Sequence, residues 1–287
     1  MIRIALAASL LMPWLAVAEP QTSIERGRYL AYAGGCITCH TAEVRGAEPF
    51  AGGRALESPF GIFYSPNITP DRETGIGAWT DDDFVRAFHE GQAPDNRYYF
   101  PAFPYTSYTG VSREDLLAIK AWLFSQPGVR KQNREHDLPW YLSSHLAAGV
   151  WQFINFTPAR FAAEPDRSEE WNRGAYLVRH LGHCGECHTP RNWLGATITD
   201  RELAGATATD AAIKSPDITP NPNQGIGKWT EDELMFFLEI GMLPDGDFAG
   251  SEMAAVIDDN TGMLTAEDRR AIAVYLESVP PSETASN

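Results

Sequence analysis

Apolar residues recur at helical spacing in two distant segments that begin in the same way. In residues 112–123 and in residues 265–276, apolar side chains stand three or four positions apart. Ser112 opens the first segment and Thr265 the second, and an Asp follows each of them three residues later, as in a capping box. This pattern predicts two amphipathic helices that begin at these hydroxyl residues.

Further helices are predicted ahead of these two. Thr80 and Thr230 each precede three acidic residues, a composition typical of a helix N-terminus. A shorter helix is expected around Tyr29 and another around Tyr176, and no run of residues alternates well enough to predict a strand. Segments rich in Pro and Gly separate these elements. The pattern predicts a mainly α fold with long irregular loops.

The predicted elements occur twice because the sequence repeats itself. The repeated blocks are residues 26–30 and 173–177, residues 67–80 and 217–230, and residues 112–123 and 265–276. The middle blocks are offset by 217 minus 67, or 150 positions. We therefore predict two tandem domains, residues 19–137 and residues 166–287, joined by residues 138–165.

The joining segment is rich in aromatic residues. They are Trp140, Tyr141, Trp151, Phe153, Phe156 and Phe161. Such side chains need a surface to bury against, so we expect an ordered strap packed across both domains. The alternative is that part of the segment forms an exposed patch that binds a partner protein.

The N-terminus has the composition of a cleaved secretory signal. Residues 1–18 contain one charge, at Arg3, and then an apolar run that ends in small residues. The run is short for a retained membrane anchor, because a bilayer span needs about 20 residues. We expect a mature chain that begins at Glu19 and is exported to the periplasm. Because residues 282–287 are polar, membrane association is expected only indirectly, through a partner.

The chain is strongly acidic. Its formal net charge is −15, and without residues 1–18 it becomes 22 minus 38, or −16. This charge excludes nucleic-acid binding, which depends on a basic surface. It serves either solubility or electrostatic steering toward a basic face of a redox partner.

All four cysteines lie in two Cys-x-x-Cys-His motifs. The motif residues are Cys36, Cys39 and His40, and Cys184, Cys187 and His188. Two thiols one helical turn apart can form thioethers with the two vinyl groups of one porphyrin, while the adjacent histidine binds the iron. A zinc ribbon would place its second cysteine pair roughly 15 to 20 residues after the first, whereas 145 positions separate Cys39 from Cys184. A thioredoxin-like redox pair would need a βαβ setting that these surroundings do not indicate. Each motif therefore predicts one covalently bound haem c, with His40 and His188 as proximal iron ligands.

The two copies differ at the position expected to supply the sixth iron ligand. In a class I cytochrome c domain, a methionine beyond the middle helix usually fills this position. Met253 lies there in the second copy, while Met242 and Met263 are interpreted as a loop residue and a core residue. Subtracting the offset of 150 from Met253 leads to Phe103, and the first copy contains no methionine after residue 18. The first haem therefore lacks a methionine ligand from its own domain.

Three alternatives remain for the first iron: a second histidine, a weak oxygen ligand such as Tyr105, or an open position. The histidines to consider are His89, expected on the protein surface, His136 next to the joining segment, His145 on it, and His180 and His183, expected to serve the second domain. Among them we favour His145, alongside an open position. Either would alter the potential or the reactivity of the first haem, because axial ligands help set haem potentials over roughly 0.8 V.

Three segments carry a resemblance to a known family. They are residues 67–80, residues 101–108 with the sequence Pro-Ala-Phe-Pro-Tyr-Thr-Ser-Tyr, and residues 171–192. The chain resembles the c-type cytochrome subunits that serve periplasmic dehydrogenases of alcohols, sugar acids and related substrates, over nearly its whole length after residue 18. The resemblance implies two tandem class I cytochrome c domains, His40 and His188 as proximal ligands, and Met253 as a distal ligand.

The resemblance also implies electron transfer and no substrate chemistry. In this family the subunit takes electrons from a dehydrogenase and passes them to a quinone, another cytochrome or a terminal oxidase. The alternative is a dihaem redox enzyme, such as a peroxidase, with chemistry at the first haem. The chain departs from the family at Phe103, where some members have methionine, and in having two haem motifs where the alcohol-dehydrogenase type usually has three.

Overall fold

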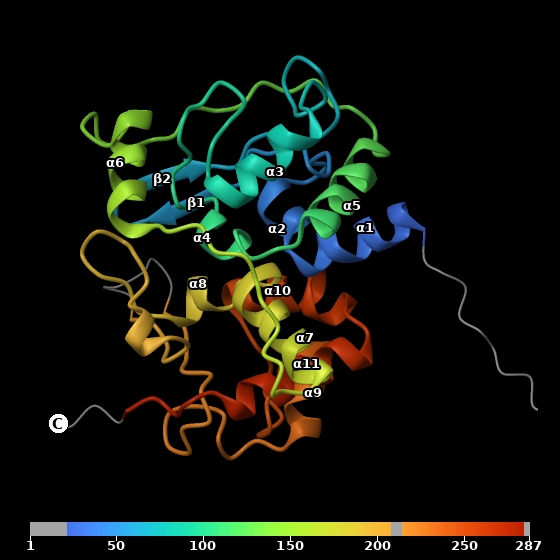
Figure 1. The fold of residues 1–287 in the computed structure, drawn as a ribbon, viewed down its shortest axis with the longest axis vertical. Coiled ribbons are helices and arrows are strands. Elements are labelled where there is room, and N and C mark those ends of the chain that lie inside the picture. Colours follow the sequence, from blue (N-terminus) through green and yellow to red (C-terminus); the bar gives the residue numbers. More distant parts are fainter. Residues whose placement is uncertain (1–21, 208–213, 284–287) are drawn as a thin grey trace, which may run out of the picture.

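The computed structural model describes residues 22–207 and 214–283, whose arrangement is shown in Figure 1. The first part contains α1 (Ser23–Ala33), α2 (Cys36–His40), β1 (Ala55–Ser58), β2 (Gly61–Tyr64), α3 (Asp81–Glu90), α4 (Tyr105–Tyr108) and α5 (Arg113–Phe124). The joining segment contains α6 (His145–Asn155). The second part contains α7 (Glu169–Tyr176), the π-helical turn η1 (Leu177–Leu181), α8 (Gly185–His188), η2 (Thr199–Arg201), α9 (Glu231–Ile240), α10 (Ser251–Asp259), η3 (Thr261–Met263) and α11 (Ala266–Ser278). The predicted mainly helical fold is confirmed, whereas the predicted signal, residues 1–18, lies outside the described residues.

A pair of crossed helices forms the centre of each part. α1 packs against α5, and α7 packs against α11 (Figure 1). The crossings are close because α1 and α7 each present a glycine to the partner helix. A Cβ atom on Gly27 would lie 1.9 Å from the carbonyl oxygen of Ala118, and one on Gly174 would lie 1.9 Å from that of Ala271. Both glycines belong to the repeated Arg-Gly pair, so the repeat in the sequence is also a repeat of helix packing.

The predicted helix starts agree with the structure. The N-caps are Thr80 for α3, Ser112 for α5, Thr230 for α9 and Thr265 for α11. Among these four, a complete capping box forms at Thr80 and Thr230. There the carboxylate of the third helical residue, Asp83 or Glu233, also accepts a hydrogen bond from the backbone N–H of the N-cap. The boxes predicted at Ser112 and Thr265 are wrong in this detail. The reason is that the carboxylates of Asp115 and Asp268 bind other partners.

Asp115 joins α5 to both parts of the chain. Its Oδ1 accepts a hydrogen bond from Arg26 Nε of α1 at 3.0 Å. Its Oδ2 accepts one from the Tyr176 hydroxyl of α7 at 2.6 Å. The arginine comes from the same part as the carboxylate, and the tyrosine comes from the other part.

Asp268 of α11 repeats this arrangement with the roles of the two parts exchanged. Arg173 of α7 donates two hydrogen bonds to it, at 2.8 and 2.6 Å, and the Tyr29 hydroxyl of α1 donates one at 2.6 Å. We call the Tyr29 and Tyr176 interactions the crossed tyrosine contacts. They bind together two parts whose hydrophobic core is continuous.

The joining segment touches both parts but leaves much of its aromatic surface in solvent. Trp151, Phe156 and Phe161 are partly buried. Trp151 Nε1 donates to the carbonyl oxygen of Leu194 in the second part at 2.7 Å, and the Phe156 ring lies 5.0 Å from that of Tyr105 in the first part. The remaining aromatic residues, Trp140, Tyr141 and Phe153, are exposed.

A small β-hairpin departs from the all-helical expectation. β1 and β2 pair antiparallel, with Ala55 opposite Tyr64 and Ser58 opposite Gly61. Strands of four residues are too short to give a recognisable alternation of polar and apolar positions. Gly61 has φ of 127°, a conformation that glycine adopts most readily, and it closes the turn.

In residues 22–207 and 214–283, no helix combines the length and the apolar character required to cross a bilayer.

Candidate haem sites

Each Cys-x-x-Cys-His motif forms one turn of helix at the end of a longer helix. α2 carries the first motif, and the second motif comprises Cys184, the N-cap of α8, and α8 itself. The residue before each first cysteine is left-handed, with φ of 66° at Gly35 and 43° at His183, and this turn redirects the chain into the motif. Because residues three apart share one face of a helix, the two thiols of each motif lie on the same side.

The two motif histidines are held in the same way. Nδ1 of His40 donates to the carbonyl oxygen of Pro66 at 2.8 Å, and Nδ1 of His188 donates to that of Pro216 at 2.8 Å. Burial lowers the pKa of both rings, and the hydrogen bonds to the prolines only partly oppose this effect, so each imidazole is neutral near pH 7. Within the described residues, Nε2 of neither ring has a hydrogen-bond partner, so both are oriented to bind a metal through Nε2.

The four cysteines differ in exposure: Cys36 is buried, Cys39 and Cys184 are partly buried, and Cys187 is exposed. All four are free, and burial raises the pKa of Cys36 and of Cys184 to about 12. In the part of the chain that the structure describes, no group of three or more His, Cys, Asp and Glu side chains is placed to hold a metal ion. Each motif therefore offers two protonated thiols and one neutral imidazole, and this donor set fits a haem attached through two thioethers.

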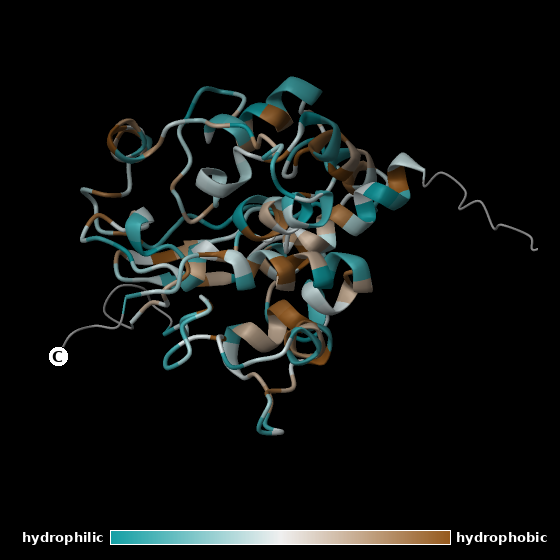
Figure 2. Ribbon diagram, turned by 60° about the horizontal axis from the view of Figure 1, so that its bottom comes forward, coloured by the Kyte–Doolittle hydropathy of each residue, from teal (hydrophilic) through white to brown (hydrophobic). Residues whose placement is uncertain are grey.

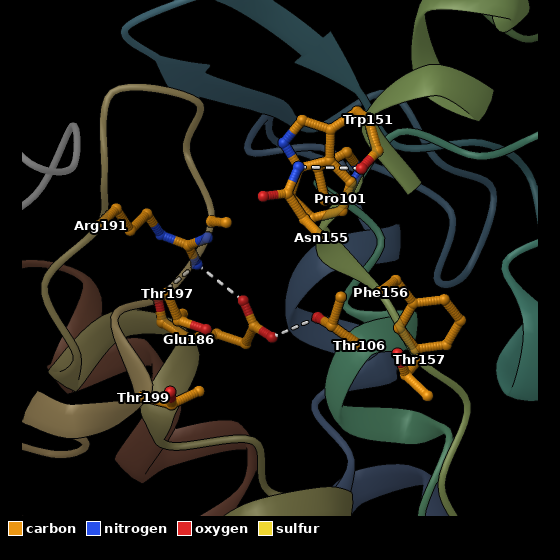
Figure 3. Close-up of a pocket in the computed structure, with 11 residues that line it drawn as sticks. Pro101, Thr106, Trp151, Asn155, Phe156, Thr157, Glu186, Arg191, Thr197 and Thr199 are labelled. Carbon is orange, nitrogen blue, oxygen red and sulfur yellow. Dashed lines mark hydrogen bonds and ion pairs between the residues drawn. The ribbon is translucent and has the colours of Figure 1, made fainter. Parts of the chain in front are cut away.

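The second motif is held by the first part of the chain. Glu186, between the two cysteines, accepts hydrogen bonds from the hydroxyls of Thr106 and Ser107 of α4, each at 2.8 Å. Arg191 Nη2 donates to the same carboxylate at 2.7 Å, as Figure 3 shows. Burial alone would raise the pKa of Glu186, but Arg191 and the two hydroxyls outweigh burial and keep the carboxyl ionised.

The first motif is held in turn by the second part. Buried Arg54 donates through Nη1 to the carbonyl oxygen of Thr38 in α2 at 2.7 Å, and through Nη2 to Glu252 of α10 at 2.6 Å. The Thr38 hydroxyl also donates to Asp259, at the other end of α10, at 3.4 Å. No sequence pattern pointed to Arg54, which lies in a loop outside any motif, or to Glu186, which occupies a variable motif position.

These contacts bring the two motifs close together. Burial above all raises the pKa of Cys187 to about 11; the charge of Glu186 adds to this effect and that of Arg191 opposes it. A Cβ atom on Gly35, the residue before Cys36, would lie 3.7 Å from Cε1 of His183, the residue before Cys184. The two sites therefore meet at the interface between the parts.

The two positions expected to supply the sixth ligands, Met253 and Phe103, lie in different surroundings. Met253 is partly buried on α10, next to Glu252. Phe103 is packed among aromatic rings. Its ring centroid lies 5.1 Å from that of Phe88, 5.5 Å from that of Tyr99 and 5.7 Å from that of Tyr108.

Met242 and Met263, the two rivals of Met253, have different surroundings. Met242 is part of a loop, as expected, and forms an isolated antiparallel β-bridge with Phe248. The prediction of a core role for Met263 is wrong, because 48% of its surface is exposed in the short helix η3.

His145, proposed for the first iron, lies at the start of α6. Its Nδ1 donates to the carbonyl oxygen of Tyr98 at 3.1 Å, and Arg97 Nη1 donates to its Nε2 at 3.3 Å. Both ring nitrogens are thus engaged, and iron binding would require one of these contacts to break. His136 accepts a hydrogen bond from the backbone N–H of Tyr64 at 3.1 Å.

The expectations for the remaining histidines need correction. His89 is buried, 6% exposed, because its Nε2 donates to the carbonyl oxygen of Val111 at 2.7 Å. His180 and His183 were expected to serve the second domain, but both contact the first part. His180 Nδ1 donates to the carbonyl oxygen of Ser107 at 3.0 Å, and the His183 ring lies 5.1 Å from that of Tyr108.

Comparison with known proteins gives the family. A search of protein-family models found no match to the chain. The chain is 41% identical over 261 residues to a diheme cytochrome c-type protein of Cereibacter sphaeroides, a match that covers 90% of this chain and 86% of the relative. It is 37% identical over 285 residues to the gluconate 2-dehydrogenase cytochrome c subunit of Pantoea cypripedii, covering 93% of this chain. It is 38% identical over 264 residues to the fructose dehydrogenase cytochrome subunit of Gluconobacter japonicus, covering 90% of this chain.

The last two relatives are considerably longer than the matched region. The chain spans 63% of the gluconate 2-dehydrogenase subunit and 53% of the fructose dehydrogenase subunit. Its similarity to the Cereibacter sphaeroides protein, in contrast, extends over most of both chains. With two equivalent cysteine and histidine sites, the chain therefore belongs to the dihaem c-type cytochromes and carries two covalently bound haem c groups.

Proposed function

We propose that this chain is an electron-transfer protein of the periplasm, built from two tandem cytochrome c domains, residues 19–137 and residues 166–287. It takes electrons from a partner dehydrogenase and passes them to a downstream acceptor, which is a quinone, another cytochrome or a terminal oxidase. The haem groups supply one-electron redox chemistry when bound. The names of the gluconate, fructose and alcohol dehydrogenase cytochrome subunits support a dehydrogenase as the electron donor. The composition of residues 1–18 supports export.

One observation carries this proposal: both haem motifs face the same interface. Glu186 of the second motif binds α4 of the first part, and Thr38 of the first motif binds α10 of the second part. The protein therefore fixes the two sites close to each other through contacts from both parts. Such an arrangement suits passage of an electron from one site to the other within a single chain.

The residues have separate roles in this proposal. Cys36, Cys39, Cys184 and Cys187 hold the two haem groups. His40 and His188 bind the two irons through Nε2, oriented by the carbonyl oxygens of their prolines. Met253 is the sixth ligand at the second site. The first site has Phe103 at the matching position, and it uses His145 or has an open position.

The test is direct reduction of the purified full chain. We expect a dehydrogenase purified from the same complex, supplied with its substrate, to reduce both haem groups, and a downstream acceptor to reoxidise them. If the dehydrogenase reduces neither group, the proposed function is wrong.

Phe103 favours a second candidate, a redox enzyme with chemistry at the first haem, because a phenylalanine side chain offers no donor atom. Carbon monoxide added to the reduced protein separates the two functions. Two low-spin spectra unchanged by carbon monoxide would exclude the enzyme. A carbon monoxide adduct at one haem would argue against a simple carrier and against His145 as a tight ligand.

A further inference from the structure

A group of large apolar side chains lies exposed on one edge of the molecule. Each is between 54% and 90% exposed. We call this group the apolar platform, and its members are Trp140, Tyr141, Leu146, Val150, Phe153, Ile154 and Trp193. Figure 1 places α6 at the edge of the molecule, and Figure 2 shows hydrophobic positions along it.

Helix α6 forms the middle of the platform. Its four members of the group stand at positions i, i+4, i+7 and i+8 of one helix, which is the spacing of a single helical face. The opposite face is anchored: Ala148 and Gln152 are buried, and Gln152 Nε2 donates to the carbonyl oxygen of Glu90 at 2.6 Å. Gly149 allows close packing, because a Cβ atom there would lie 2.7 Å from the Tyr98 ring. The outer face is therefore held in the solvent by the packing of the inner face.

The other members continue this surface at both sides of α6. Trp140 and Tyr141 contact each other edge to face at 5.8 Å, and they precede the helix by a few residues. Trp193 follows the second haem motif, and its neighbour Leu194 accepts the hydrogen bond from Trp151 of α6. At 150 to 250 Å² per ring, the four aromatic side chains alone present on the order of 600 Å². That area matches the largest exposed apolar patch of a typical monomer, which is roughly 300 to 600 Å² and often functional.

Apart from Trp193, which follows Arg191, the platform lies in a segment without formal charge in an otherwise acidic protein. Residues 138–159 contain no Asp, Glu, Lys or Arg, although the chain has a net charge of −15. The complementary surface is therefore apolar and uncharged. Interfacial membrane helices carry Lys and Arg on their polar face, and α6 has none. A second copy of the chain would bring two strongly negative molecules together.

The position of the platform connects it to both haem sites. His145 attaches α6 to Tyr98 in the loop that precedes Phe103, and Gln152 attaches it to Glu90 at the end of α3. On the other side, a cavity of about 200 Å³ lies between α6 and the second motif, lined among others by Trp151, Glu186 and Arg191 (Figure 3). A protein bound to the platform would thus lie beside segments that hold both haem motifs.

From this charge, area and position, we propose that the apolar platform is the docking surface for the dehydrogenase that reduces this chain. The inference rests on the proposed function. The partner is a protein with an apolar, uncharged face that covers α6, Trp140, Tyr141 and Trp193. Docking here brings the electron donor next to the haem motifs, and the acidic remainder of the surface stays free for the downstream acceptor.

The test replaces three of the most exposed members with serine in the full chain: Trp140→Ser, Phe153→Ser and Trp193→Ser. These side chains are 84% to 90% exposed, so folding and haem attachment are expected to remain intact. A matched control carries Val44→Ser and Phe236→Ser, two exposed apolar residues outside the platform. The assay measures haem reduction by the purified dehydrogenase with its substrate, at increasing concentrations of the cytochrome.

We expect the triple variant to need at least tenfold more cytochrome for half-maximal rate. Reduction by dithionite and both midpoint potentials should stay unchanged, and the control variant should behave like the wild type. If the dehydrogenase reduces the wild type and the triple variant equally well, the platform is not the docking surface. If it reduces neither protein, the proposed function itself fails.

Two further outcomes would overturn the inference in favour of another occupant. In the first, the wild type binds vesicles of phosphatidylethanolamine and phosphatidylglycerol, and the triple variant loses this binding but is reduced at an unchanged rate. That result would assign the platform to a lipid surface. The second is a wild-type dimer in sedimentation that the triple variant abolishes without a change in rate. That result would assign the platform to a second copy of the chain.

Discussion

The crossed tyrosine contacts should contribute measurably to the stability of the chain. We consider Tyr29→Phe and Tyr176→Phe, which remove one hydroxyl each and keep the ring. Each hydroxyl donates to a buried carboxylate at 2.6 Å and accepts a hydrogen bond from a helix N-cap at 3.2 Å. Both carboxylates keep their arginine partners in the variants.

The magnitude follows from the type of hydrogen bond. A hydrogen bond to a charged group contributes roughly 1.5 to 3 kcal/mol. Each substitution also removes the hydroxyl oxygen that accepts a hydrogen bond from the N-cap amide. We therefore expect each substitution to lower the free energy of unfolding by about 2 kcal/mol. The two contacts share no residue, so the double variant should lose about 4 kcal/mol.

The assay is guanidinium denaturation of the haem-loaded protein, followed by circular dichroism and by haem absorbance. Tyr141→Phe is the matched control, because Tyr141 is exposed and should change stability by no more than about 0.5 kcal/mol. The two parts should also unfold less cooperatively in the double variant, so that the two signals separate. A loss below about 0.5 kcal/mol in both single variants would refute the reasoning.

Three other perturbations test separate features. Gly27→Ala and Gly174→Ala should each lower the unfolding free energy by about 3 kcal/mol in thermal denaturation, because a Cβ would clash with the facing carbonyl. Gly250→Ala is the control, because open space surrounds that position. Equal stability of all three variants would contradict the prediction. Met253→Ala should lower the midpoint potential of one haem by on the order of 0.1 V in a spectral redox titration. Met263→Ala, at an exposed position, should leave both potentials unchanged. Unchanged potentials in both variants would show that Met253 is not an iron ligand. Burial alone would raise the pKa of Asp268, but the bonds from Arg173 and Tyr29 hold that pKa below its usual value, so its stabilisation is present above pH ~3.9 and is lost as the pH falls through the lower folded-state pKa. Asp268→Asn should therefore lose less stability than the wild type on acidification, and parallel pH curves would show that the carboxylate has no such role.

Local patterns in the sequence were sufficient for the starts of four main helices and for the chemistry of the haem motifs. The helix starts at Thr80, Ser112, Thr230 and Thr265 depend on contacts over three residues, and each is an N-cap in the structure. The two Cys-x-x-Cys-His motifs depend on five consecutive residues, so their covalent chemistry was predictable without a fold. The hairpin was missed because its strands have only four residues each.

Surroundings of individual residues were harder to predict, because burial depends on distant elements. His89 was expected at the surface, but Val111, 22 positions later, provides its hydrogen-bond acceptor. Met263 was expected in the core, but the short helix η3 exposes it. Asp115 and Asp268 have capping-box spacing, yet stronger partners on other helices take their carboxylates.

The sequence by itself was enough to reveal its internal repeat, the helical character and two covalent haem c groups. The way in which the two copies interlock became visible in the folded chain alone. Tyr29 reaches Asp268 across 239 positions, and Thr106 reaches Glu186 across 80. Such contacts arise when whole helices pack against each other, and packing depends on shape and buried charge that no local pattern contains. The same packing turned the inner face of α6 toward the protein and left its apolar outer face free.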